Sequence, residues 1–120
     1  MSGYSRGLEE EDLAVRFLAG RGYKILDRNW RCRAGEIDIV AKGPNGALVI
    51  AEVKSRSGKN EEGAWASLGE AKQKKLSRLA LWYLKEKGLP LETEIRFDAV
   101  LVLPQGIRHE PGFFEPEREI

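Results

Sequence analysis

One stretch of 20 residues, GEIDIVAKGPNGALVIAEVK at 35–54, constrains the fold of this chain more than any other part. Two runs of apolar residues flank a Gly-Pro-Asn-Gly turn, which is the pattern of a β-hairpin. Each run also carries an acid in its middle, Asp38 in the first and Glu52 in the second. The interior of a strand is an unfavourable place for a carboxylate, so this pair needs a physical explanation.

The pattern of apolar residues predicts one register for this hairpin. If paired residue numbers sum to 90 around a three-residue loop centred on Asn45, one face is wholly apolar: Ile37 faces Val53, Ile39 faces Ala51, and Ala41 faces Val49. On the other face Glu36 meets Lys54, Val40 meets Ile50, and Asp38 lies opposite Glu52. Like charges at directly opposed positions, with Cβ atoms ~5 Å apart, are destabilising. A slip of one residue would turn one strand over, so the sequence imposes this unfavourable pair.

A divalent cation would remove the repulsion between Asp38 and Glu52. The two carboxylates, together with the backbone carbonyl of Val53, offer hard oxygen ligands suited to Mg²⁺ or Mn²⁺. Lys54 projects from the same face as Glu52, where its ammonium could deprotonate a water or stabilise charge on a phosphate. Such a set of groups suits phosphodiester hydrolysis. A solvated sheet face that carries charged residues is the alternative, and the pattern alone leaves it open.

The charges of the chain are unevenly distributed along its length. Residues 1–88 carry 17 Lys and Arg against 12 Asp and Glu, whereas residues 89–120 carry 3 against 7. Basic clusters on a small domain suit a phosphate backbone, although charge runs are also common on solvated faces. No apolar run approaches the ~20 residues that span a bilayer. The single cysteine excludes an internal disulfide, and we expect a cytoplasmic protein without membrane contact or small-molecule cofactor.

The remaining periodicity predicts a single α/β domain with a mixed central β-sheet flanked by helices, in the order α-β-β-β-α-β. A capping box at Ser67 and Glu70 is expected to open the second helix, and Gly88 to end it. We expect a core of about residues 8–103 and a C-terminal tail at 104–120, held by two phenylalanines. The predicted elements are a helix at 9–20, strands at 23–30, 36–41 and 47–54, a helix ending at 88, and a strand at 94–103.

These residues resemble the PD-(D/E)xK nuclease superfamily, with its restriction-endonuclease-like fold. More closely, the chain resembles the small bacterial YraN family of Holliday-junction-resolvase-like proteins. The spaced motif of GEID followed by EVK and an arginine is fairly specific, whereas a bare ExK is not. The matching segments are EDLAVRFLAGRGYKIL at 11–26, NWRCRAGEIDIVA at 29–41, VIAEVKSR at 49–56, KQKKL at 72–76 and RFDAVLV at 96–102.

The resemblance implies roles for individual residues. Asp38 and Glu52 are similar to the metal ligands of the superfamily, and Lys54 to its catalytic lysine. Glu11 resembles the helix acid that completes the metal site in archaeal junction resolvases. Helical spacing does not separate it from Glu10, because both can border the buried face of the helix.

Further residues have weaker assignments. Glu36 is either another ligand or a partner of Lys54. Gln73 resembles a glutamine that supports the site in some superfamily members, and a capping role is the alternative. For Asp98 we expect a structural hydrogen bond, and for Trp30 core packing. The expected contacts to nucleic acid come from Arg31 and Arg33 in a basic loop, from Arg56, and from Lys72.

We therefore expect a Mg²⁺- or Mn²⁺-dependent endonuclease that acts on DNA. The resemblance suggests branched or Holliday-junction DNA, and such a substrate calls for a two-fold homodimer. The sequence does not separate DNA from RNA. The alternative function is a nucleic-acid-binding module that keeps the fold without turnover.

Overall fold

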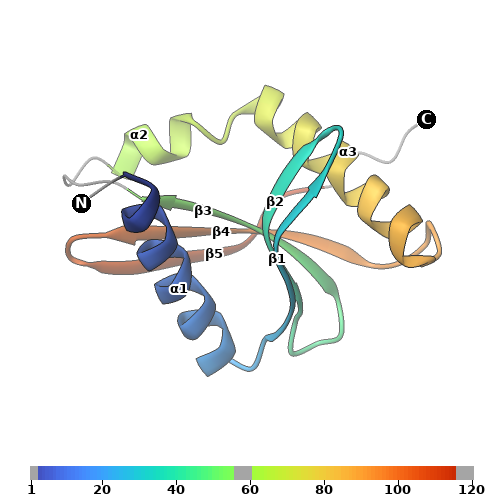
Figure 1. Cartoon of the computed structure of the whole chain (residues 1–120), viewed down its shortest axis with the longest axis horizontal. Coiled ribbons are helices and arrows are strands. Elements are labelled where there is room, and N and C mark those ends of the chain that lie inside the picture. Colours follow the sequence, from blue (N-terminus) through green and yellow to red (C-terminus); the bar gives the residue numbers. More distant parts are fainter. Residues whose placement is uncertain (1–2, 56–60, 116–120) are drawn as a thin grey trace.

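The computed structural model describes residues 3–55 and 61–115 of the chain. It has three helices and five strands in this part, and Figure 1 shows their arrangement. In chain order the elements are α1 (Gly3–Gly20), β1 (Lys24–Cys32), β2 (Gly35–Lys42), β3 (Leu48–Ser55), α2 (Glu61–Ala66), α3 (Glu70–Lys87), β4 (Ile95–Leu103) and β5 (Gly106–Phe114).

The five strands form one mixed sheet with helices on both faces, as predicted. The strands lie in sequence order; only β3 and β4 are parallel, and the helices α2 and α3 form the crossover between them. α1 packs on one face through Ala14 and Leu18, against Ile39, Val49 and Val100. α3 covers the other face with a cluster that includes Leu76, Leu79, Tyr83, Ile50 and Phe97. The sheet is therefore buried on both sides.

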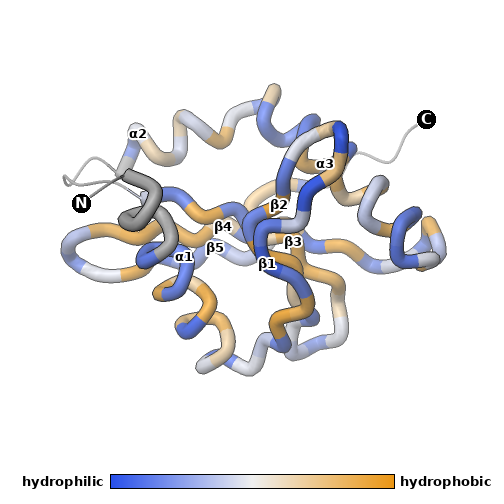
Figure 2. The backbone as a smooth tube through the Cα atoms, in the orientation of Figure 1, coloured by the Kyte–Doolittle hydropathy of each residue, from blue (hydrophilic) through white to orange (hydrophobic). Residues whose placement is uncertain are grey.

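Hydrophobic residues follow this layered arrangement. Figure 2 shows orange and blue residues in alternation along the coloured part of α1, as expected for a helix that covers a sheet with one face. Among the described residues, no helix is both long and apolar enough to cross a membrane.

The hairpin between β2 and β3 has the predicted register. Ile39 pairs with Ala51, Val40 with Ile50, and Ala41 with Val49, so that paired numbers sum to 90. The N–H of Gly43 donates to the carbonyl of Ala47 at 2.9 Å, which leaves three residues in the loop around Asn45. The paired ladder ends at Ile39 and Ala51, one residue before Asp38 and Glu52.

The predicted apolar face is wrong beyond that point, because β1 and β2 change face. Ile37 packs with Trp30 and α3, whereas Ile39, two residues further on, packs with α1. The partner strand contains the cause: Asn29 has a φ of 51°, which is the left-handed region and breaks the alternation of β1 between Arg28 and Trp30. The end of the β1–β2 hairpin consequently lies over α3 (Figure 1).

The start of the second long helix differs from the prediction, whereas its end agrees. Ser67 does not cap it; its hydroxyl donates to the carbonyl of Ala64 at 2.6 Å and closes the short helix α2. Gly69 occupies the N-cap without a side-chain hydrogen bond. Gly88 ends α3 in the left-handed conformation, with φ of 68°, as glycine does at many helix ends.

The expected C-terminal tail is also wrong, since residues 106–114 form the edge strand β5. β5 pairs with β4 from Gly106 opposite Leu103 to Phe114 opposite Phe97. The sequence did not predict this strand, because it contains Pro111 and Gly112 and neither residue type favours a strand. At the edge of a sheet a proline is tolerated, since its missing N–H faces away from the ladder.

Candidate functional site

Asp38 lies where the backbone hydrogen bonds between β2 and β3 end, and its carboxylate makes the next hydrogen bond to β3. Its Oδ2 accepts a hydrogen bond from the backbone N–H of Val53 at 2.8 Å. A main-chain donor that would otherwise lose its partner at the end of the ladder is thereby satisfied. The acid in the middle of β2 thus holds the two strands together where their backbones separate.

Burial raises the pKa of Asp38 to about 7, and the negative charge of Glu52 contributes to the rise. A hydrogen bond between the two carboxyl groups and the charge of Glu11 raise this pKa further, while the Val53 N–H opposes the shift. Two acids this close disfavour simultaneous ionisation. Asp38 and Glu52 therefore lie close together, as predicted. Asp38 retains a proton to higher pH than a free aspartate does.

Glu52 is buried in β3, with two ammonium groups beside it. Its Oε2 lies 3.6 Å from Nζ of Lys54 and 2.8 Å from Nζ of Lys72 in α3. Glu52 is only 4% exposed. The structure thus brings Asp38, Glu52 and Lys54 together, and it adds Lys72, which the sequence suggested only as a phosphate contact.

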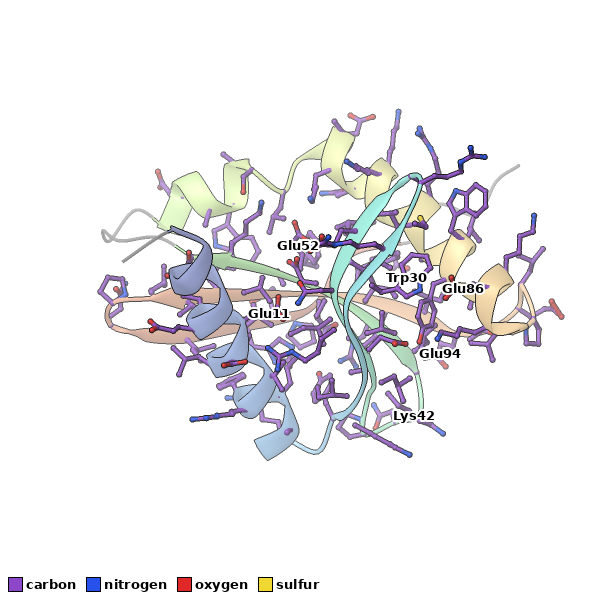
Figure 3. All side chains as sticks on the ribbon, in the orientation of Figure 1. Glu11, Trp30, Lys42, Glu52, Glu86 and Glu94 are labelled. Atoms are coloured by element: carbon purple, nitrogen blue, oxygen red, sulfur yellow. The ribbon has the colours of Figure 1, made fainter. Side chains whose placement is uncertain are left out.

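Glu11 projects from α1 toward the same region, and Figure 3 shows it with Glu52 between α1 and the β1–β2 hairpin. Its Oε1 accepts hydrogen bonds from Arg28 Nη2 at 3.0 Å and from Asn29 Nδ2 at 2.9 Å. Glu11 is buried, at 8% exposure, while Glu10 is half-buried. The burial and the effect of its charge on Asp38 favour Glu11 over Glu10 as the acid near the site.

The donor set fits a cation through Asp38 and Glu52. The carboxyl of half-buried Asp38 adjoins that of buried Glu52, and Val53 follows Glu52 on the same strand. Within residues 3–55 and 61–115, however, no three or more Asp, Glu, His or Cys side chains are gathered as a ready metal site. The carboxylate of Glu11, the third predicted ligand, already accepts hydrogen bonds from Arg28 and Asn29.

The predicted contacts to nucleic acid have different positions. Arg31 is exposed and lies in β1 rather than in a loop, where it pairs with Glu36 at 2.8 Å across the hairpin. Of the two alternatives for Glu36, the pairing with Lys54 is therefore wrong, since Lys54 pairs with Glu52 instead. Arg33 is exposed at the hairpin turn, next to Gly35, which packs against Lys75 and Leu79 of α3. Arg56 lies outside the described residues.

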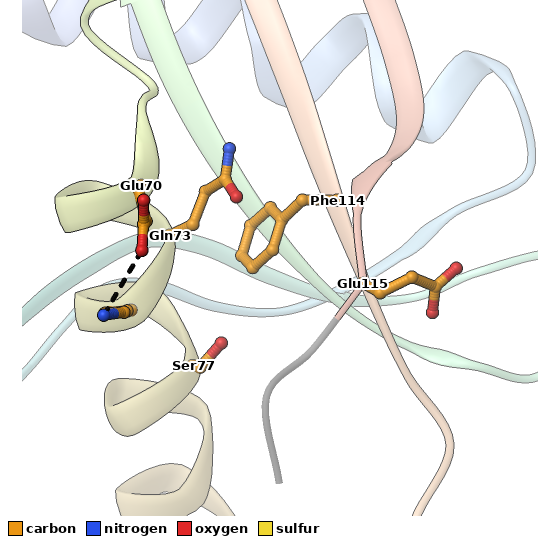
Figure 4. A pocket seen from close by; sticks show the side chains of 6 residues that line it. Glu70, Gln73, Ser77, Phe114 and Glu115 are labelled. Atoms are coloured by element: carbon orange, nitrogen blue, oxygen red, sulfur yellow. Dashed lines mark ion pairs between the residues drawn. The ribbon is translucent and has the colours of Figure 1, made fainter.

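Gln73 is turned toward the helix start. Its Nε2 donates to the carbonyl of Leu68 at 2.9 Å, as the capping alternative predicts. Figure 4 shows Gln73 on the wall of a pocket of about 180 Å³ between α3 and the end of β5. The lining residues are Glu70, Gln73, Lys74, Ser77, Phe114 and Glu115. The pocket does not include Asp38 or Glu52, so it is separate from the paired acids.

A second buried acid, Asp98 of β4, has the structural role that we expected. It accepts hydrogen bonds from Tyr23, Arg96 and the N–H of Gly112, and its Oδ2 lies 2.8 Å from Nε2 of His109. Burial alone would raise the pKa of Asp98, but the bonds from His109 and Arg96 outweigh it and lower the pKa to about 2. The His109 contact could not be found in the sequence, since it depends on β5.

The sequence also missed two residues near the paired acids, Arg28 and Asn29, and the pairing of a third, Lys72, with Glu52. Arg28 and Asn29 hold Glu11, and Lys72 binds Glu52. The signal for Lys72 was its place in the basic first turn of a helix. Asn29 had a weaker signal, since asparagine is one of the few residues that adopts the left-handed conformation readily.

Fold and site together define a class: small α/β proteins whose mixed sheet carries two adjoining acids, Asp38 and Glu52, with lysines beside the second. Residues 10–102 match the family described as Uncharacterised protein family UPF0102. The chain belongs to this family, which is the YraN family.

Relatives of this family cover most of the chain. A UPF0102 protein from Lachnoclostridium phytofermentans is 43% identical over 85% of this chain and 86% of its own length. One from Streptomyces griseus is 48% identical over 78% of this chain and 77% of its own. A third, from Syntrophotalea carbinolica, is 40% identical over 92% of both chains. The names of these relatives give the family and no activity.

Proposed function

We propose that this protein is a Mg²⁺- or Mn²⁺-dependent endonuclease that hydrolyses phosphodiester bonds in DNA. One observation carries the proposal: half-buried Asp38 adjoins buried Glu52, and Nζ of Lys54 lies 3.6 Å from Oε2 of Glu52. Burial, and after it the charge of Glu52, raises the pKa of Asp38 to about 7. A buried pair of like charges costs stability, and such strained acids concentrate at functional sites. The resemblance to the PD-(D/E)xK nucleases assigns the same residues.

In this proposal Asp38 and Glu52 hold the cation, with the Val53 carbonyl as a further oxygen ligand. Such a cation supplies a water of lowered pKa and neutralises charge on the phosphate. Lys54 acts on the attacking water or on the charge that develops at the phosphate. Glu11 would serve as an outer acid, held by its hydrogen bonds from Arg28 and Asn29. Exposed Arg31 and Arg33 would contact the DNA backbone.

A second candidate is a nucleic-acid-binding module without turnover. It is favoured by the balance of charges in the structure, where Lys54 and Lys72 already compensate Glu52, and Arg28 compensates Glu11. A protein with this arrangement can fold and bind phosphate without a metal. The two candidates differ in one measurable property, which is cleavage.

The test is an incubation of the purified protein with linear, nicked, flapped and four-way DNA in EDTA, Mg²⁺ or Mn²⁺. We expect cleavage that needs the cation and is lost in Asp38→Asn and Glu52→Gln. Lys54→Ala should retain cation binding and lose about 100-fold or more in turnover, in line with the usual contribution of such a group. Preference for four-way DNA and a dimer in solution would support the junction substrate.

Glu70→Gln is the matched control, since it also removes one acid. Glu70 is exposed and pairs with Lys74 on the surface of α3. Cleavage by this variant should equal wild type. DNA binding without cleavage in any metal would favour the binding module, and cleavage that persists in Asp38→Asn would show that the acids are structural.

A further inference from the structure

Lys72 makes the shorter of the two ion pairs to Glu52, although it comes from a different element. Its Nζ is 2.8 Å from Oε2 of Glu52, whereas Nζ of Lys54 is 3.6 Å from the same oxygen. Lys72 stands in the first turn of α3, and its side chain is 30% exposed. The buried carboxylate oxygen of Glu52 is thus already paired with an ammonium group that α3 supplies.

A metal ion and the Lys72 ammonium compete for this oxygen. Mg²⁺ binds carboxylate oxygens at about 2.1 Å, so a metal ion at Oε2 would lie within about 5 Å of an ammonium that stays 2.8 Å from it. Charges at that separation repel strongly in a buried site, where solvent screens them little. One cation has to leave Oε2.

Lys72 is the one that can leave. Lys54 is tied to Glu52 by the strand they share, two residues apart on one face. Lys72 belongs to α3, and the long flexible stem of a lysine lets its ammonium swing into solvent at little cost. A phosphate bound at the site would then meet this freed charge.

We propose that Lys72 is the counter-ion of Glu52 in the metal-free protein, and that cation binding releases it to the phosphate backbone of the substrate. The inference rests on the proposed function, because it needs a cation at Asp38 and Glu52. It makes Lys72 a positioning residue that couples the two ligands: the cation frees an ammonium for DNA, and DNA retains that ammonium away from Glu52. Cation and DNA therefore bind cooperatively.

The direct test is the rate at which Lys72 reacts with an amine-acetylating reagent, followed by mass spectrometry of the full-length protein in EDTA and in Mn²⁺. We expect the rate at Lys72 to rise several-fold in Mn²⁺. Lys74 is an internal control, since it pairs with exposed Glu70 on the same helix and should react equally in both buffers. In Glu52→Gln, Lys72 should react fast without any cation.

A thermal melt with Mn²⁺ separates failure of this inference from failure of the proposed function. If Mn²⁺ raises the melting temperature while the rate at Lys72 stays constant, the cation site stands and the exchange is refuted. If Mn²⁺ changes neither, the cation site and the exchange both fall, and Lys72 is a permanent structural partner of Glu52.

Metal affinity gives a second readout, because removal of a merely structural lysine would not tighten metal binding. Lys72→Ala removes the competing charge, so calorimetry should show tighter Mn²⁺ binding by several-fold. Lys74→Ala should bind Mn²⁺ as wild type does. Weaker binding in Lys72→Ala would contradict the exchange.

Discussion

Two aspartates of the sheet, buried Asp98 and half-buried Asp38, have opposite surroundings. Asp98 receives hydrogen bonds from a tyrosine, an arginine, a histidine and a backbone N–H, and its pKa falls to about 2. Asp38 receives one backbone N–H and faces another carboxyl group, and its pKa rises to about 7. Both sit in strands of one sheet within one small domain. Burial raises the pKa of both aspartates, and their partners decide the net direction.

This contrast teaches how to separate a structural acid from one that is available for chemistry. Every hydrogen bond to Asp98 stabilises its ionised form. These bonds join β4 to β5 and to Tyr23. Asp38 is held in place but keeps a charge that the surroundings disfavour. A bound cation or a proton would neutralise this charge.

The largest expected effect is at the satisfied acid. Asp98→Asn should lower the free energy of unfolding by about 3 kcal/mol, because it leaves Arg96 and His109 beside a neutral group. Urea denaturation at pH 7 measures this loss. Asp12→Asn, which removes an exposed acid paired with Arg28, should cost at most about 1 kcal/mol. Equal small losses in both variants would remove the contrast.

The next effect concerns pH, and the two acids act with opposite sign. Asp38 has a folded pKa of about 7 against an ordinary 3.8, so its contribution to stability is complete below pH 3.8 and is lost as the pH rises through 7. Asp98 has a folded pKa of about 2, so its contribution is complete above pH 3.8 and is lost as the pH falls through 2.

Asp38→Asn should isolate the first of these contributions. At pH 8 in EDTA we expect this variant to be more stable than wild type by about 1 to 3 kcal/mol, with the gain absent at pH 4. Chemical denaturation at the two pH values is the measurement. A loss of stability at pH 8 would mean that Asp38 is as structural as Asp98.

The next, smaller effect is the stabilisation that a bound cation gives, which should depend on Asp38 and be independent of Asp98. With Mn²⁺ at ten times its dissociation constant, wild type should gain about 1.4 kcal/mol at pH 8. Below pH 7 the gain should shrink, because the proton on Asp38 competes with the metal. Asp38→Asn should lose the gain, and Asp98→Asn should keep it. Thermal melts with and without Mn²⁺ follow all three proteins.

The smallest effect concerns the exposed cations near the turn of the β1–β2 hairpin. The double change of Arg31 and Arg33 to Ala should flatten the salt dependence of DNA binding, by about 0.9 in the log–log slope for each phosphate that an arginine no longer neutralises. Fluorescence anisotropy over a salt series measures it. An unchanged slope would place the DNA elsewhere. Folding stability should change little, since both side chains are exposed.

Much of the fold could be predicted, because local patterns decide it. The alternation around Asn45 set the register of β2 and β3, and Gly88 marked the end of α3. β5 could not be predicted, since Pro111 and Gly112 suit an edge strand only when a neighbour is already in place. The same holds for the change of face at Asn29, which no period of two reveals.

The candidate site was predictable where it depends on a single hairpin. Asp38 and Glu52 directly follow the last pair of the predicted register, Ile39 with Ala51, so the hairpin pattern was sufficient to place them and Lys54 near one another. The contacts that join separate elements were not predictable: Arg28 with Glu11 links β1 to α1, and Lys72 with Glu52 links α3 to β3. Their geometry depends on how the helices pack, which periodicity does not fix.

Asn29 combines two tasks that other residues would separate. Its left-handed backbone turns the end of the β1–β2 hairpin over α3, and its amide donates to Glu11 at 2.9 Å. Glycine would supply the backbone conformation without the amide, and aspartate would supply a side chain of the same shape that repels the acid. A protein engineer could therefore uncouple the course of the chain from the anchoring of Glu11 with one codon.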